Sequence, residues 1–390
     1  MELNSKFVKM IARDLTPFIK KAMKGFPVVT ITGPRQSGKT TLAKHLVASS
    51  YVNLEAIDKR DFANTDPRGF LEDNHKRPLI IDEAQYAPKL FSYVQVEVDH
   101  TGKKGQFILT GSQNFELNAH ISQSLAGRTA LYTLLPLSIN ELRNAKKLSA
   151  KMEDVFFKGG YPRVFQKNVD RNTWLSAYVR TYIERDVRQL VNVQRIELFN
   201  RFIKLCAARI GQMVNANAIS NELGVDVKTV QSWLSVLEAS YIIFLLRPHH
   251  KNFGKRLVKT PKLYFHDTAL ATFLLGVESS AQLINHPLKG ELFENLMVSE
   301  LMKQRWHAGK EPNLFFWRDN TGNEIDVLQE DGTKLNLFEI KSSKTYSPSF
   351  AKGLKFYDSI TTTKTKKIVV YAGTDIQQRD GISLVNWRKV

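Results

Sequence analysis

The segment Gly33–Thr40 carries the residue types of a loop that binds phosphate. Its sequence, Gly-Pro-Arg-Gln-Ser-Gly-Lys-Thr, matches the P-loop pattern at every fixed position. Glycines allow backbone N–H groups to surround phosphate oxygens, and the N-terminus of a following helix favours an anion. Lys39 can reach the β- and γ-phosphates of ATP, and the Thr40 hydroxyl can bind Mg²⁺. We therefore expect ATP to contact this loop and the residue after it, namely Gly33, Pro34, Arg35, Gln36, Ser37, Gly38, Lys39, Thr40 and Thr41.

Two acidic residues, Asp82 and Glu83, end the apolar run Leu79–Ile81. Beside a P-loop, Asp82 is expected to hold Mg²⁺ through its water shell, and Glu83 to orient and activate the attacking water. Without the P-loop, the same residues indicate only a strand that ends in solvated acids. Because both acids are present, the sequence favours hydrolysis of ATP over phosphoryl transfer to a small molecule. Glu83 and Lys39 are the predicted catalytic residues.

A third run, Ile108–Asn114, is strand-like and ends in small polar groups. Strands of one parallel sheet end on the same edge, so Ser112 is placed to sense the γ-phosphate. A role in capping a turn is equally compatible with a serine at this position.

Short β-rich runs alternate with helical stretches over the first third of the chain. The runs occupy residues 26–32, 51–54, 78–82, 105–110 and 130–134. This order predicts a parallel sheet with helices on both faces, and hence an α/β domain over residues 25–143. Residues 1–24 are expected to form an amphipathic helix that leads into this domain.

In combination, these motifs resemble those of the prokaryotic AAA+-type ATPases that carry a C-terminal domain of unknown function. The resemblance covers almost the whole chain and rests on Thr32–Thr41, Leu79–Gln85, Leu109–Gln113, Leu125–Arg128 and Tyr182–Val187. It implies a five-stranded nucleotide-binding core and an arginine that acts on a phosphate, in cis or from a neighbouring subunit. Arg128 is the first candidate and Arg185 the second, although either side chain also suits a structural salt bridge. An arginine that acts in trans implies a homo-oligomer.

Residues 144–285 are predicted to form a helical domain that contains a winged helix. The segment Asn217–Leu237 has the apolar spacing of a helix–turn–helix, in which Gly224 suits the turn and Asp226 can cap the second helix. That second helix presents polar side chains of the types that contact base edges or phosphates: Lys228, Thr229 and Gln231.

A basic hairpin is expected after this helix, with Tyr241–Leu246 and Pro261–Asp267 as its strands. Its cationic residues are predicted to contact nucleic acid: Arg247, Lys251, Lys255 and Arg256. Lys and Arg outnumber Asp and Glu by more than two to one between Leu198 and Leu270, which favours a nucleic-acid partner. Winged helices also dock proteins, so a protein partner stays open. His249 and His250 lack a spaced third ligand and do not indicate a metal site.

Residues 286–390 are predicted to form a third, α/β domain in which a helix precedes three strands. Within Glu339-Ile-Lys341 the two charged residues share one face of a strand. Asp326 begins the preceding strand, and Glu294 lies on the leading helix. This arrangement resembles the PD-(D/E)xK nuclease fold, which implies that Asp326, Glu339 and Glu294 bind Mg²⁺ while Lys341 supports the attacking water. The fold also serves as a binding platform, and a plain surface ion pair between Glu339 and Lys341 remains an alternative.

The composition narrows the class of partner. The formal net charge of +18 favours a polyanionic partner. Together with the predicted winged helix, this charge indicates that the partner is a nucleic acid. The single cysteine excludes an intrachain disulfide, and no apolar run reaches the roughly 20 residues of a membrane span, so we expect a cytoplasmic protein with no membrane partner. ATP and Mg²⁺ are the expected cofactors and DNA is the expected partner. The alternatives are a nucleotide-gated switch that binds a protein and an ATP-regulated, Mg²⁺-dependent nuclease.

Overall fold

The computed structural model describes the chain except for residues 1–9, 48–49, 113–120, 122, 184–195, 250–259 and 375–376, and except for the side chains of residues 182 and 183. The chain divides into two compact units. The first unit consists of residues 1–137 and 305–310, and the second of residues 138–304 and 311–390. Each unit is described by itself.

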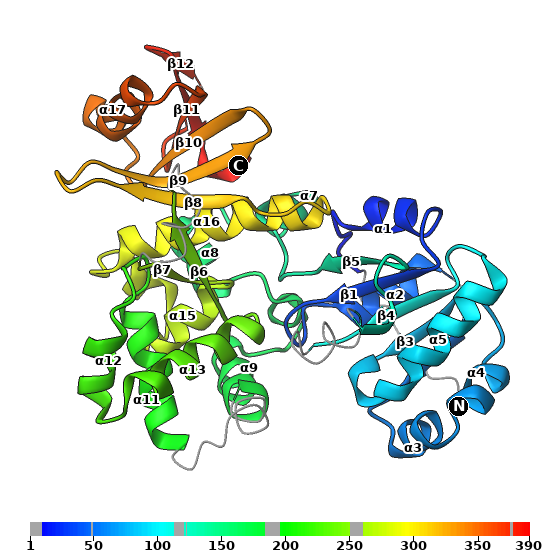
Figure 1. Ribbon diagram of the computed structural model, residues 1–390. Helices are drawn as coiled ribbons and strands as arrows, with labels where there is room; N and C mark the ends of the chain where they lie inside the picture. Colours follow the sequence, from blue (N-terminus) through cyan, green and yellow to red (C-terminus); the bar gives the residue numbers. More distant parts are fainter. Residues whose placement is uncertain are drawn as a thin grey trace. The chain divides into compact units, whose positions relative to one another are not determined.

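The first unit contains a five-stranded, fully parallel sheet with the strand order β2-β3-β4-β1-β5 (Figure 1). This confirms the five-stranded core and the α/β class predicted for this part of the chain. The strands are β1 (Val28–Thr32), β2 (Ser50–Asn53), β3 (Leu79–Asp82), β4 (Phe107–Thr110) and β5 (Thr129–Thr133). The helices are α1 (Thr16–Ala22), α2 (Lys39–Leu46), α3 (Ile57–Thr65), α4 (Pro67–Asp73) and α5 (Pro88–Thr101).

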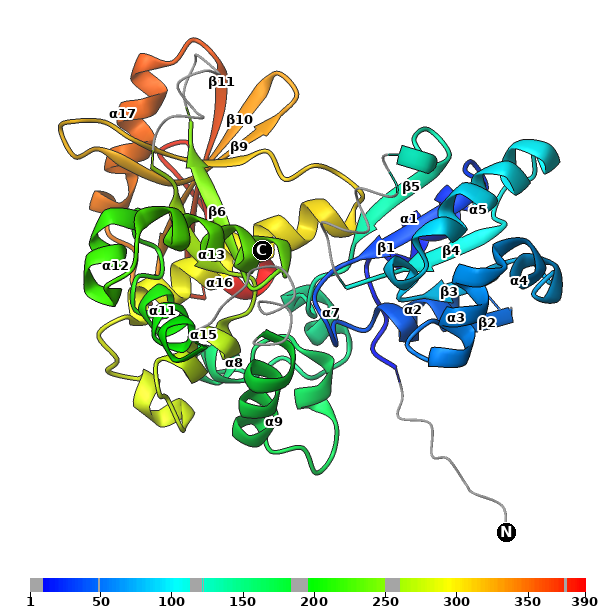
Figure 2. The same cartoon turned by 60° about the horizontal axis from the view of Figure 1, so that its bottom comes forward.

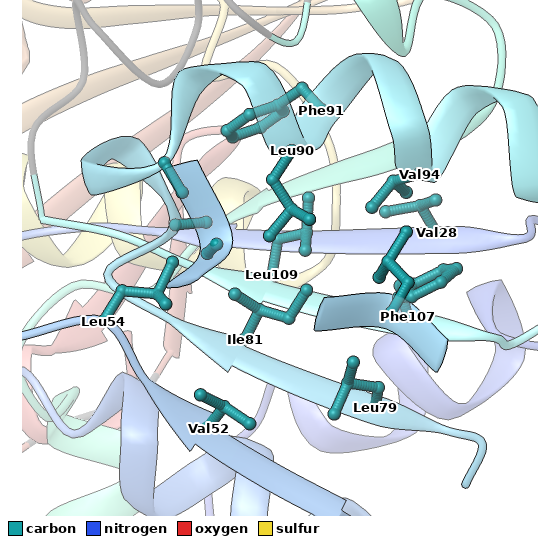
Figure 3. Close-up of a cluster of buried hydrophobic side chains, with 14 of the residues drawn as sticks. Val28, Val52, Leu54, Leu79, Ile81, Leu90, Phe91, Val94, Phe107 and Leu109 are labelled. Carbon is teal, nitrogen blue, oxygen red and sulfur yellow. The ribbon is translucent and has the colours of Figure 1, made fainter. Parts of the chain in front are cut away.

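Helices cover both faces of this sheet. Consecutive residues of a strand point to opposite faces, so each strand contributes side chains to both layers of helices. Val28 and Ile81 pack with α3, α4 and α5 in one buried cluster, shown in Figure 3. Val29 and Ile80 pack with α1 and α2 on the other face. The strands are therefore apolar on both sides, and their polar residues gather at the strand ends.

The helix predicted for residues 1–24 is shorter than expected. Within the described residues, 10–15 are not helical, and α1 begins only at Thr16. Pro17 lies in the first turn of α1. A proline has no N–H and clashes with the carbonyl four residues earlier, so a helix can begin just before it but cannot run through it. The prediction is wrong for residues 10–15 for this reason.

The second unit begins with helices that lead into an extended sheet. Its helices are α7 (Ile139–Asn144), α8 (Met152–Lys158), α9 (Arg171–Tyr178), α11 (Ile196–Ala208), α12 (Ala216–Leu223), α13 (Val227–Ala239), α15 (Thr268–Leu274), α16 (Lys289–His307, whose last residues belong to the first unit) and α17 (Lys352–Ile360). A π-helical segment, Val179–Ile183, continues α9, and short 3-10 helices occur in the two units at Ala84–Tyr86, Pro162–Phe165, Ser280–Leu283, Pro348–Ala351 and Trp387–Lys389.

The helix–turn–helix geometry predicted for Asn217–Leu237 is present as α12 and α13. Gly224 ends α12 in the left-handed conformation, with φ of 67°. The Asp226 carboxylate accepts a hydrogen bond from the Thr229 backbone N–H at 2.8 Å and so caps α13. The local turn and cap signals in the sequence therefore placed both helix ends.

The second unit also contains an eight-stranded mixed sheet with the order β12-β13-β11-β10-β9-β8-β6-β7. Its strands are β6 (Ile243–Pro248), β7 (Lys262–Phe265), β8 (Leu314–Arg318), β9 (Glu324–Asp331), β10 (Lys334–Lys341), β11 (Lys364–Tyr371), β12 (Gln377–Arg379) and β13 (Ile382–Asn386). Helix α17 packs against this sheet through Leu354 and Tyr357. Figure 2 shows the helix alongside β11.

The β6–β7 hairpin, expected as a separate wing, is part of this sheet. Arg247 and Pro248 of β6 pair in parallel with Phe315 and Phe316 of β8. The hairpin thereby brings its return strand β7 to the edge of the same sheet that carries the predicted nuclease-like residues. None of the helices in the described part of the chain is both long and apolar enough to span a membrane.

Candidate active site

The P-loop connects the end of β1 to the start of α2. Gly33 and Gly38 both have positive φ, 138° and 100°, which glycine adopts without strain. A Cβ atom on Gly33 would lie 2.2 Å from the Leu134 carbonyl oxygen, so no larger residue fits there. Helix α2 begins at Lys39, and its N-terminus faces the loop. The residues predicted to contact ATP therefore all lie in this loop or in the first turn of α2.

The loop holds its lysine in a buried position that suits an anion. Lys39 is 5% exposed, and its Nζ donates hydrogen bonds to the carbonyl oxygens of Gly33 at 3.0 Å and Pro34 at 2.9 Å. The Ser37 hydroxyl is buried and has no hydrogen-bond partner among the described residues. A buried ammonium and an unsatisfied hydroxyl in one glycine loop fit a phosphate group that supplies the missing acceptors.

Asp82, at the end of β3, is held by three hydroxyl groups. Its Oδ2 atom accepts hydrogen bonds from Thr40 Oγ1 at 2.8 Å and from the Tyr51 hydroxyl at 2.9 Å. Its Oδ1 atom accepts one from Thr110 Oγ1. The structure thus joins Thr40 and Asp82, the two residues predicted to hold Mg²⁺ at the ATP site. Hydroxyl and carboxylate oxygens are the hard ligands that this ion prefers.

Glu83 follows in the left-handed conformation, with φ of 54°, and turns its carboxylate toward the same sheet edge. Its Oε2 atom accepts hydrogen bonds from Gln85 Nε2 at 2.6 Å and from Ser112 Oγ at 2.9 Å. Burial raises the pKa of this carboxyl, but the charge of Lys39, the Gln85 hydrogen bond, the charge of Arg35 and the Ser112 hydrogen bond together lower the pKa below its usual value. Glu83 is therefore ionised at neutral pH and can accept a proton.

Several residues of this site carry no motif of their own. Arg13 is 6% exposed and donates to the carbonyl oxygens of Ser37 at 2.7 Å and Leu135 at 2.6 Å, so it braces the P-loop. Tyr51 reaches Asp82 from the neighbouring strand. Nothing in the local sequence distinguishes either residue. Thr110 and Gln85, in contrast, lie within segments that the sequence already marks.

Arg128 does not lie with the other predicted residues. It directly precedes β5, and its carbonyl accepts a hydrogen bond from the Val28 N–H at the start of β1. The P-loop follows the other end of β1, roughly 16 Å away at about 3.3 Å per strand residue. The guanidinium pairs with the exposed Asp99 carboxylate at 2.6 Å. Arg128 is therefore not placed to reach the phosphates of its own chain, and Arg185 lies outside the described residues.

The second predicted site forms on β9, β10 and α16 of the second unit. Lys341 Nζ lies 2.7 Å from Glu339 Oε1 and 3.5 Å from Asp326 Oδ2. The Ile340 backbone N–H donates to Asp326 Oδ2 at 2.7 Å, which fixes that carboxylate. The Glu339 Oε2 atom is buried without a hydrogen-bond partner. The structure thus brings together the acid–x–lysine pair and the preceding aspartate.

Glu294 of α16 joins this group through residues of β7. Lys262 Nζ lies 3.1 Å from Glu294 Oε1 and 2.6 Å from Glu324 Oε1, and its side chain is 7% exposed. The Tyr264 hydroxyl donates to the same Glu294 oxygen. We call Lys262, Glu294, Glu324, Asp326, Glu339 and Lys341 together the acid–lysine cluster. The sequence did not reveal Lys262 or Tyr264, because both belong to the predicted wing.

The charges of the acid–lysine cluster do not balance. Four carboxylates face two ammonium groups. Burial and the neighbouring Asp326 raise the pKa of Glu294 to about 7, against the opposing effect of Lys262. The same two causes raise the pKa of Glu339 to about 8, against the opposing effect of Lys341. Glu294 and Glu339 therefore tend to keep their protons near neutral pH, which reduces the negative charge of the cluster.

The predicted nucleic-acid residues are only partly described. On α13, Lys228 and Gln231 are exposed, whereas the Thr229 hydroxyl is bonded to Asp226 Oδ2 at 2.7 Å. Arg247 is exposed on β6. Lys251, Lys255 and Arg256 lie outside the described residues, as does His250. His249 is buried between Glu330 and Tyr357, 3.2 Å and 3.1 Å from its ring nitrogens.

The glycine loop with Lys39 and Thr40, followed by Asp82 and Glu83 on a parallel sheet, defines a P-loop ATPase domain. Comparison with known families agrees, since residues 25–143 match the family model described as AAA domain. Residues 149–281 and 289–390 match two further models, described as Domain of unknown function (DUF8612) and Domain of unknown function (DUF4143).

Similar proteins occur in several bacteria. The chain is 31% identical over 349 residues to Uncharacterized protein Rv2008c of Mycobacterium tuberculosis and to Uncharacterized protein Mb2031c of Mycobacterium bovis, covering 88% of this chain and 76% of each relative. An uncharacterized protein of Haemophilus influenzae is 24% identical over 311 residues, covering 71% of this chain and 74% of that protein. The chain belongs to the family of these proteins, with an AAA domain ahead of two domains of unknown function.

Among solved structures, the chain is similar to the Walker-type ATPase paby2304 of Pyrococcus abyssi, at a TM-score of 0.46 and 14% identity. The similarity covers 70% of this chain and 99% of the archaeal one. At this TM-score it supports no further conclusion.

Proposed function

We propose that this protein binds ATP with Mg²⁺, hydrolyses it, and uses the change of nucleotide state to act on DNA. The observation that carries the first part is the convergence of Lys39, Asp82 and Glu83 at one edge of the sheet. Lys39 neutralises the phosphates, while Thr40 and Asp82 would hold Mg²⁺. When bound, that ion supplies positive charge that stabilises the transferring phosphoryl group.

Glu83 acts as the proton acceptor for the attacking water. Its pKa is lowered below the usual value, so it is charged before ATP arrives. Ser112 and Gln85 hold its Oε2 atom in place, and Oε1 remains for the water. Removal of such a base typically slows a reaction by 10²–10⁴-fold.

The variant Glu83→Gln tests this assignment. We expect ATP binding within a few-fold of wild type and turnover reduced at least about 100-fold, measured by nucleotide binding and phosphate release. Glu72→Gln, an exposed acid on α4, is the matched control and is expected to hydrolyse normally. Wild-type turnover by Glu83→Gln shows that the base lies elsewhere.

The DNA part of the proposal rests on charge and on the helix–turn–helix. The net charge is +18, and Lys228 and Gln231 of α13 and Arg247 of β6 are exposed. Contacts to phosphates release counterions, so DNA affinity is expected to fall steeply with salt. The variant Lys228→Ala is expected to reduce the salt slope by about one. No binding at low salt, or affinity that does not change with salt, favours a protein partner instead.

A Mg²⁺-dependent nuclease is a second candidate, favoured by the acid–lysine cluster. Asp326, Glu339 and Lys341 lie together on adjacent strands, and the cluster retains excess negative charge. In the described part of the chain, these carboxylates do not lie close enough together to form a group of metal ligands. Lysine side chains lie between them. Nicking by wild type in Mg²⁺, absent with Asp326→Ala, supports this candidate. Equal nicking by both proteins points to a contaminant.

A further inference from the structure

Tyr51 makes a contact in the ATP site that the proposed mechanism has not used. It lies on β2, which pairs with β3 so that Tyr51 is opposite Ile80, two residues before Asp82. From there its hydroxyl donates to Asp82 Oδ2 at 2.9 Å. Lys44 of α2 lies above its ring, 3.5 Å from the ring centroid. The ring is thus held between the sheet and α2, and the hydroxyl is aimed at the carboxylate.

Counting acceptor positions shows what this contact does to Asp82. An ionised carboxylate offers about four lone-pair positions, two on each oxygen. Thr40 and Tyr51 occupy both positions of Oδ2, and Thr110 occupies one position of Oδ1. One acceptor position, on Oδ1, is left on a residue that is 4% exposed.

We propose that Tyr51 is a positioning residue for the Mg²⁺ of the ATP site, because it fixes Asp82 so that a single acceptor position remains for the metal's water shell. The inference rests on the proposed binding of ATP and Mg²⁺ at this loop. Without the Tyr51 hydroxyl, Oδ2 keeps only the hydrogen bond from Thr40, so the carboxylate is held less firmly. Asp82 must then be ordered when the metal binds, and the metal is held less well. The phosphates themselves are contacted by the loop and Lys39, which Tyr51 does not touch.

The test is nucleotide binding with and without the metal, using a fluorescent ATP analogue. In Tyr51→Phe, which keeps the ring, we expect unchanged affinity in EDTA. The Mg²⁺ concentration that half-maximally tightens binding should rise about tenfold, the size expected for loss of one hydrogen bond to a charged group. Tyr93→Phe removes the same atom from an exposed tyrosine of α5 and is expected to match wild type.

The outcomes separate this inference from the proposed function. An unchanged Mg²⁺ midpoint in Tyr51→Phe overturns the positioning role, and so does an equal loss of affinity with and without Mg²⁺. Thr110→Val removes the donor to the other oxygen and is expected to shift the midpoint in the same direction. A wild-type protein that binds no nucleotide in either condition overturns the proposed function itself.

Discussion

The ATP site and the acid–lysine cluster both gather charged side chains on strands, and they differ in which charge is left over. In the ATP site, buried Lys39 rests on two backbone carbonyls, and Arg35 lies in the same loop. In the acid–lysine cluster, four carboxylates face Lys262, Lys341 and, at 4.0 Å from Glu324, Arg318. The first site retains positive charge and the second retains negative charge.

This difference also shows in the direction of the pKa shifts. The pKa of Glu83 is lowered, because cations and hydrogen-bond donors outweigh its burial. The pKa values of Glu294 and Glu339 are raised to about 7 and 8, because burial and Asp326 outweigh the lysines. A carboxylate at the ATP site is thus ready to act as a base at neutral pH. Glu294 and Glu339 of the cluster are instead partly protonated at neutral pH.

The largest effect is expected for Lys39→Ala, which removes the cation that distinguishes the ATP site. The Lys39 ammonium is the one cation that the fixed positions of the P-loop pattern contain. ATP affinity should therefore fall by about 100-fold or more. Isothermal titration with ATP and Mg²⁺ measures this loss. Lys59→Ala, on the exposed surface of α3, is the control and should bind ATP normally. Undiminished binding or hydrolysis by Lys39→Ala contradicts the site assignment.

In the acid–lysine cluster, the corresponding removal of a cation is the variant Lys262→Ala. It leaves Glu294 and Glu324 without their shared countercharge, and breaking a buried pair in this way costs about 3–5 kcal/mol. Urea denaturation followed by tryptophan fluorescence measures the free energy of unfolding. Lys355→Ala is the control, since its ion pair with Asp380 spans 3.9 Å and both side chains are mostly exposed. Equal stability of the two variants contradicts a structural role for Lys262.

A pH titration tests the raised pKa values that distinguish the acid–lysine cluster from the ATP site. The folded pKa values of Glu294 and Glu339, about 7 and 8, lie above the usual value of 4.5, so the folded cluster binds more protons than the unfolded chain. The contribution of these two carboxyls to stability is therefore greatest below pH of about 4.5 and is lost as the pH rises to about 8, at no more than about 1.4 kcal/mol per pH unit for each carboxyl.

A cluster that binds Mg²⁺ when deprotonated should lose less stability in the presence of this ion. Melting temperatures from pH 5 to 8.5, with Mg²⁺ and with EDTA, measure the effect in nucleotide-free protein. Glu339→Gln is expected to flatten the dependence in EDTA. A metal effect that is the same at pH 5 and pH 8.5 argues against cation binding by the cluster.

The sequence predicted best what is local along the chain. The P-loop conformation depends on Gly33 and Gly38, and the adjacent Asp82 and Glu83 follow from one strand end. The sequence also placed Ser112 at the sheet edge that carries the P-loop, because parallel strands end at one edge, and there it contacts Glu83 at 2.9 Å. These features need only the strand order and the rule for parallel sheets.

The sequence did not predict contacts that depend on the pairing of distant strands. Tyr51 reaches Asp82 only because β2 lies beside β3 in a particular register. Lys262 reaches Glu294 because β6 pairs with β8 and draws the hairpin into the large sheet. A hairpin that is interpreted as a wing is expected to pair only with itself, so the further pairing of β6 with β8 was not predicted. Arg128 was placed near the phosphates by resemblance, without regard to the end of β5 on which it lies.

The smallest effect is therefore expected for Arg128→Ala. The side chain lies at the sheet edge opposite the P-loop and is paired with Asp99, so ATP affinity should stay within twofold of wild type. A large loss of affinity contradicts this placement. A contribution from a neighbouring subunit has a different signature, namely reduced hydrolysis with normal binding. In that case, mixing Arg128→Ala with Lys39→Ala restores activity, because each chain supplies what the other lacks. Failure of mixing to restore hydrolysis excludes Arg128 as the arginine that acts in trans.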